Sequence, residues 1–83
     1  MFHFKNSYER ELDRIIADIN MNMSNNYKDN AQMDLKRLEN TYAKYVEEGK
    51  IKEKGIELYS RIISEYQSRL KGYTHKDQKP YWT

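Results

Sequence analysis

The stretch from Asn26 to Lys50, NYKDNAQMDLKRLENTYAKYVEEGK, decides the fold of this chain. Its apolar residues recur at intervals of four, three, four and three, which is the spacing of one face of a helix. Gly49 ends the pattern, because glycine adopts the left-handed conformation at a helix C-terminus without a steric penalty. A helix of this length spans roughly 36 Å, so we expect it to be the central member of a bundle. The positions on its apolar face are Ala31, Leu35, Leu38, Tyr42, Tyr45 and Val46.

A second amphipathic helix is predicted before this stretch. Asn6 or Ser7 is expected to cap its start, with Glu9 in the capping-box position three residues after Asn6. We assign its charged residues, Glu9 included, to the side that faces solvent. Its apolar stripe consists of Tyr8, Leu12, Ile15, Ile16, Ile19 and Met23.

The segment from Met21 to Asn26 loses the apolar period and is predicted to be the loop between these two helices. Its side chains compete with the backbone for hydrogen bonds, which favours turns and caps. Ser24, Asn25 or Asn26 is expected to cap the central helix. The alternative is one unbroken helix through this segment, since it contains neither Gly nor Pro.

A third amphipathic helix follows Gly49, with Ile51 expected to pack against its start. Gly55 weakens this helix by about 1 kcal/mol relative to alanine, and Gly72 is predicted to end it. Its stripe consists of Ile56, Tyr59, Ile62, Ile63, Tyr66, Leu70 and Tyr73. Three stripes with short connections predict an all-α protein, an antiparallel three-helix bundle over residues 1–73.

Residues 74–83, THKDQKPYWT, are predicted to form an irregular tail because Pro80 does not fit a continuing helix. The end of the chain is both basic and aromatic. Tyr81 and Trp82 either fold back over the helix ends, anchor the tail on another protein, or stack with Tyr73 on single-stranded nucleic acid. The candidate partner-binding residues are Tyr73, His75, Lys76, Lys79, Tyr81 and Trp82.

Composition predicts a folded domain with a thin core. Leu, Ile, Val and Phe make up only about 18% of the 83 residues, but the net charge is +2 and eight tyrosines add apolar area. Burial against a second copy or another protein would stabilise such a chain, so we expect association, with a homodimer as one form. The tyrosines on the stripes are assigned to the core, with an exposed tyrosine-bearing face as the alternative.

Neither a signal-like apolar run nor a membrane-spanning stretch is present, so we expect a cytoplasmic protein without membrane contact, complete as it stands. The chain lacks cysteine, and His3 and His75 have no ligands at metal-binding spacing. No nucleophile motif or phosphate loop is found either. We therefore expect no enzyme activity, cofactor or metal. The predicted function is protein–protein interaction as an adaptor, small inhibitor or homodimer; the alternative is nucleic-acid binding through the C-terminal segment.

Overall fold

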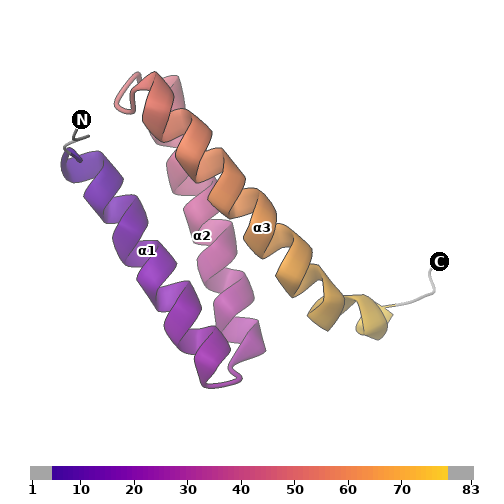
Figure 1. The fold of residues 1–83 in the computed structure, drawn as a ribbon. Coiled ribbons are helices and arrows are strands. Elements are labelled where there is room, and N and C mark those ends of the chain that lie inside the picture. The colour runs from indigo at the N-terminus through magenta and orange to yellow at the C-terminus, as the bar shows by residue number, and fades with distance from the viewer. Residues whose placement is uncertain (1–4, 79–83) are drawn as a thin grey trace.

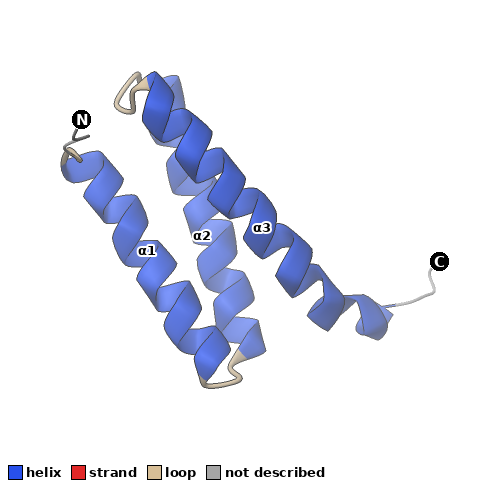
Figure 2. Cartoon of the chain, viewed as in Figure 1, coloured by secondary structure: helices blue, strands red, loops and turns tan. Residues whose placement is uncertain are grey.

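Helices account for nearly all of the described chain. The computed structural model describes the backbone of residues 5–78 and the side chains of residues 5–70. The helices are α1 (Ser7–Ser24), α2 (Lys28–Glu47) and α3 (Glu53–Gln78). Over residues 5–78 there is no strand, and Figure 2 shows helices joined by short loops. The predicted all-α class is confirmed.

The three helices form an antiparallel bundle with α2 in the middle of the chain order. In Figure 1, α1 and α2 lie side by side in opposite directions and meet at a turn at the lower end. From the upper end of α2, α3 runs back in front of α2 and slants away from α1 toward its C-terminal end, and α2 contacts both of its neighbours. The predicted up-down-up arrangement is confirmed.

The turn between α1 and α2 exists, but it is shorter than predicted. Helix α1 continues to Ser24, so most of the segment predicted as loop is helical. Asn26 has a φ of 63°, and the backbone N–H groups of Asn26 and Tyr27 donate to the carbonyls of Met23 and Asn22. This pair of bonds is a Schellman motif, which satisfies the last carbonyls of a helix.

Asn26 therefore ends α1 instead of starting α2. The N-cap of α2 is Tyr27, which makes no side-chain capping bond, so the predicted cap at Ser24, Asn25 or Asn26 is wrong. Asparagine tolerates the left-handed conformation better than most residues, which suits it to the C-terminal position of a helix as well as to a cap. The sequence alone did not separate these two roles.

Helix α2 ends in the same way, at the predicted glycine. Gly49 has a φ of 72°, its N–H donates to the Val46 carbonyl, and the Lys50 N–H donates to the Tyr45 carbonyl. The repeated Schellman geometry closes both turns of the bundle with backbone bonds alone.

Helix α3 runs past the end predicted for it. Its backbone is helical through Gly72 to Gln78, so the predicted stop at Gly72 is wrong. A glycine inside a helix lowers the stability of the helix by only about 1 kcal/mol relative to alanine, so a helix can continue through it. The helix ends at Gln78, two residues before Pro80. Proline does not fit the interior of a helix.

The core lies where the three predicted stripes meet. Its buried apolar residues are Leu12, Ile15 and Ile19 of α1, Ala31, Leu35 and Leu38 of α2, Ile51 of the loop, and Tyr59, Ile63, Tyr66 and Leu70 of α3. Tyr42 and Tyr45 are partly buried against this core. The assignment of these four stripe tyrosines to the core therefore holds, whereas Tyr73 lies beyond the described side chains. None of the helices, over the residues described, has the length and apolar character needed to cross a bilayer.

Replacing Gly49 with alanine tests the turn between α2 and α3. A Cβ at a φ of 72° strains the backbone although nothing lies within 4 Å of it, so Gly49→Ala is expected to lower the free energy of unfolding by about 1–2 kcal/mol. Chemical denaturation followed by circular dichroism measures this. The matched control is Glu48→Ala, at an exposed neighbour with a φ of −84°, which should change stability by less than about 0.5 kcal/mol. An equal loss of stability in both variants would show that the alanine at position 49 is not strained.

Candidate functional site

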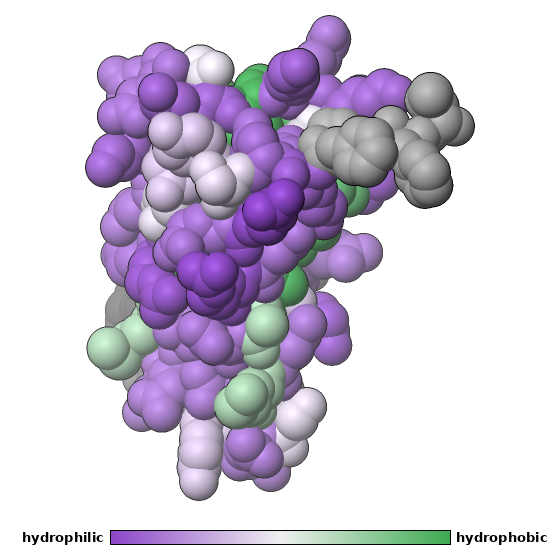
Figure 3. All heavy atoms as spheres, turned by 90° about the vertical axis from the view of Figure 1, so that its left-hand side faces the viewer, coloured by the Kyte–Doolittle hydropathy of each residue, from purple (hydrophilic) through white to green (hydrophobic). Residues whose placement is uncertain are grey.

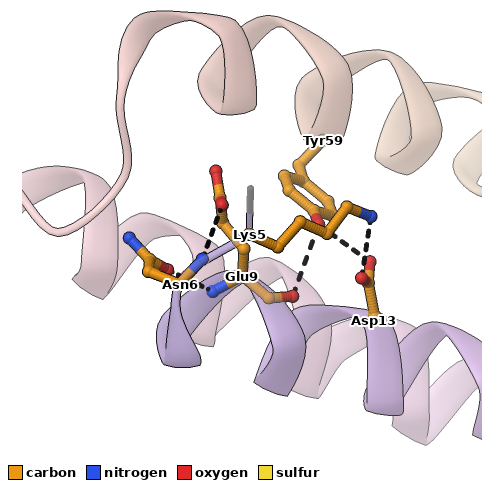
Figure 4. Close-up of polar contacts among 5 residues, drawn as sticks. All are labelled: Lys5, Asn6, Glu9, Asp13 and Tyr59. Atoms are coloured by element: carbon orange, nitrogen blue, oxygen red, sulfur yellow. Dashed lines mark hydrogen bonds and ion pairs between the residues drawn. The ribbon is translucent and has the colours of Figure 1, made fainter. Parts of the chain in front are cut away.

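A cluster of polar side chains joins the beginning of α1 to α3. Figure 4 shows this N-terminal polar cluster, which consists of Lys5, Asn6, Glu9, Asp13 and Tyr59. The Asn6 side chain accepts a hydrogen bond from the Glu9 N–H at 2.8 Å, and Glu9 Oε1 accepts one from the Asn6 N–H at 3.1 Å. The predicted capping box is therefore present, with Asn6 as the cap.

Glu9 faces the interior, which corrects its assignment to the solvent side. Its relative exposure is 1%. It lies one turn before Leu12 on the same helix face, and the capping box draws its carboxylate back over the first turn of α1. The acidic side chain of Glu9 suggested that it faces solvent. Its spacing of three residues from Leu12 was the feature that indicated the interior.

Gly55 provides the space that Glu9 occupies. A Cβ at Gly55 would clash with Glu9 Oε2 and would lie 2.7 Å from Ile51 Cγ2. The sequence treated Gly55 only as a weak point of the third helix. Its structural role is to leave room for the Glu9 side chain at the first turn of α3.

Tyr59 reaches from α3 to α1 one turn further along. Its hydroxyl lies 2.8 Å from Asp13 Oδ1 and 3.3 Å from the Glu9 carbonyl oxygen, two acceptors on α1. Lys5 Nζ lies 2.8 Å from Asp13 Oδ2 and 5.6 Å from the centre of the Tyr59 ring. Asp13 is thus shared between a cation and a hydroxyl, and it ties the segment before α1 to α3.

The surroundings of Tyr59 and Lys5 keep both groups protonated. Burial raises the pKa of Tyr59 from 10.0 to about 12, and its hydrogen bond to Asp13 acts in the same direction. The hydrogen bond to Asp13 also raises the pKa of Lys5 above its usual 10.5. Both groups already carry their proton near neutral pH, so neither can act as a catalytic base. Their role is to link α1 and α3.

The same end of the bundle holds the loop between α2 and α3. Asn6 Nδ2 donates to the Lys50 carbonyl at 3.0 Å, and Lys50 Nζ lies 5.3 Å from the centre of the Tyr8 ring. Tyr8 in turn packs edge-on against Tyr45, with ring centres 5.0 Å apart. Three segments of the chain therefore meet around the first turn of α1.

A second candidate site lies at the opposite end, where α1 and α2 meet. An open groove of about 370 Å³ is lined by Asp18, Met21, Asn22, Asn30, Met33 and Asp34, which we call the methionine groove. Met21 is 60% exposed and Met33 is 69% exposed. Tyr27, which is 56% exposed, borders an adjoining hollow that shares Asn30. Figure 3 shows one side of the molecule as largely hydrophilic, with pale green apolar groups in its lower half and deeper green ones at the top and along the right side.

Two carboxylates at the rim of the methionine groove share one arginine. Arg37 Nη2 lies 3.7 Å from Asp18 Oδ2, and Arg37 Nη1 lies 3.5 Å from Asp34 Oδ1. Asp34 also accepts a hydrogen bond from Asn22 Nδ2 at 2.7 Å. Both ion-pair distances exceed those of a good charge-assisted hydrogen bond, so one guanidinium partly offsets two negative charges. The rim keeps an acidic character.

The methionine groove was not identified from the sequence. Met21 and Met33 lie outside the apolar stripes, and that position is the signal that would have indicated exposure. The partner-binding residues named from the sequence stay predictions. Tyr73, His75 and Lys76 belong to α3 beyond the last described side chain, and Lys79, Tyr81 and Trp82 lie outside the described residues.

Comparisons with known proteins add no assignment to either site. No protein family matches the sequence, and neither a curated protein nor a solved structure is significantly similar to the chain. Within the described residues, no group of three or more His, Asp or Glu side chains is placed to hold a metal ion. The function is therefore inferred from the geometry of the two sites.

Gly55→Ala tests the close contact with Glu9. An alanine usually stabilises a helix relative to glycine by about 1 kcal/mol, but here overpacking is expected to lower the stability by about 1–3 kcal/mol. The exposed neighbouring variant Lys54→Ala should leave stability nearly unchanged. The loss caused by Gly55→Ala should also shrink in a Glu9→Ala background, because the clashing carboxylate is then gone. A Gly55→Ala protein more stable than the wild type would refute the contact.

The pKa of Tyr59 predicts a dependence of stability on alkaline pH. Because the folded pKa is about 12 and the unfolded pKa is 10.0, the contribution of the protonated hydroxyl is complete below pH 10 and is lost between pH 10 and 12. The wild type should therefore lose more stability over this range than Tyr59→Phe, by up to about 1.4 kcal/mol per pH unit. Denaturation curves at successive pH values measure this. Tyr27→Phe, at an exposed tyrosine, should follow the wild type, and parallel losses in wild type and Tyr59→Phe would exclude the effect.

Proposed function

We propose that this chain is a non-enzymatic protein-interaction module that binds its partner at the methionine groove. The observation that carries the proposal is the exposure of Met21 and Met33 from two different helices on one groove, with Tyr27 beside them. Large apolar side chains gathered on a small soluble domain are typical of binding surfaces. Methionine also adapts its shape to a partner more readily than branched residues do.

The chemistry of the groove indicates a partner segment that is apolar and also basic. The groove is lined by methionine side chains, and its rim carries Asp18 and Asp34, which are both paired with Arg37. A Lys or Arg on the partner would complement this rim, while an apolar side chain would cover Met21 and Met33. Complementary charge mainly sets which partner binds and how fast it associates, and apolar burial supplies most of the affinity.

The remaining parts of the molecule offer less support for binding through another surface. Tyr59 and Tyr66 are buried, and Tyr42 and Tyr45 are partly buried, so the stripe tyrosines do not form an exposed face over the described residues. Binding through the C-terminal residues and a cytoplasmic location both stay predictions from the sequence. Lys5 and Tyr59, whose pKa values are both raised, suit a structural role better than a catalytic one.

Site-specific crosslinking tests the proposal. A photo-crosslinking amino acid replaces Asn30, which borders the groove, and the matched control carries it in place of Ala43, an exposed residue of the same helix. In cells that produce the protein, position 30 should give a defined crosslinked partner and position 43 should not. The partner peptide attached at position 30 should contain apolar residues beside Lys or Arg.

Two variants separate the apolar and the charged contributions to binding. Met21→Gln with Met33→Gln should weaken the crosslink at least about tenfold, because burial of one methionine contributes about 1.5 kcal/mol or more. Asp18→Asn should weaken it less and should reduce its sensitivity to salt. Equal crosslinking from both positions, an acidic partner peptide, or attachment to a second copy of the chain would each overturn the proposed partner.

A further inference from the structure

The methionines described here occupy two different environments. Met21 and Met33 are more than half exposed and line the same groove from α1 and α2. Met23 lies only two residues from Met21 but is partly buried and packs against the core. A reagent in solution therefore meets the first two side chains over most of their surface, whereas Met23 presents a smaller part of its side chain, at a separate surface hollow.

We propose that Met21 and Met33 form a paired oxidation site, at which hydrogen peroxide converts both side chains to sulfoxides while the bundle stays folded. At each residue a sulfur lone pair attacks one peroxide oxygen, so that an S–O bond forms as the O–O bond breaks. The proton on the attacked oxygen passes to the departing hydroxide, and water is released. Each sulfur loses two electrons, and each peroxide is reduced by two.

The position of the pair explains why oxidation spares the fold. Sulfoxidation turns a flexible apolar side chain into a polar one, which is destructive in a core and tolerable in contact with water. Neither Met21 nor Met33 belongs to the buried cluster formed by the three helices. Their modification changes the groove instead, because the two apolar side chains that line it both become polar. That oxidation controls binding rests on the proposed function, but the selectivity of oxidation does not.

Peptide mass spectrometry of the intact chain after peroxide treatment is the decisive measurement. Met21 and Met23 lie on one tryptic peptide, residues 15–28, so fragment spectra must separate them. Met21 and Met33 should be oxidised at least about fivefold faster than Met23, as their exposure requires. Circular dichroism should show unchanged helix content at the point where both are converted. Oxidation of Met23 at the same rate, or loss of helix as Met21 and Met33 react, would overturn the proposal.

A variant and a repair enzyme complete the test. The oxidised wild type should lose the crosslink from position 30 and regain it with methionine sulfoxide reductases. Met23→Leu, which removes the methionine outside the groove, should lose and regain the crosslink in the same way. If selective oxidation occurs but the crosslink persists, oxidation does not regulate binding and the proposed function stands. If the untreated protein gives no crosslink, the proposed function fails while the oxidation site stands on its own selectivity.

Discussion

The buried carboxylate of Glu9 is the constraint on which the arrangement of α1 and α3 depends. A charged group is tolerated inside a protein only where hydrogen bonds replace its water. Here the capping box supplies such a bond, and the missing Cβ of Gly55 supplies the space. The position of α3 relative to α1 is thereby fixed at one end of the bundle by contacts that have strict distance requirements, while the apolar stripes contribute burial along its length.

The apolar stripes could be predicted because helical periodicity is a local property. Residues three and four apart share a face whatever the helix packs on, so Leu12, Leu35 and Ile63 were placed correctly before their neighbours were known. The same holds for Gly49, since its left-handed conformation follows from the helix that precedes it. The order and direction of the helices then followed from short connections.

The roles that could not be predicted depend on contacts between distant segments. Glu9 was assigned to solvent because it is acidic; its spacing to Leu12 indicated the inner face, but nothing near it in sequence indicated that Gly55 would leave room for it. Tyr59 was placed in the core, but its bond to Asp13 joins residues 46 apart. The methionine groove arises from two helices that meet across a turn, and neither helix carries a motif for it. A resemblance to known proteins would have supplied such pairings; here only the structure does.

The two ends of the bundle differ in how freely they can change. At the end that holds Glu9, Gly55 and Tyr59, each side chain has a partner at a fixed distance, so most substitutions there disturb several helices together. At the α1–α2 turn, backbone bonds close the chain around the left-handed Asn26, and the side chains of Met21 and Met33 take no part in these bonds. The surface of Met21 and Met33 can therefore diverge between related chains without a new core, and a small bundle of this kind can acquire new partners while its architecture is inherited.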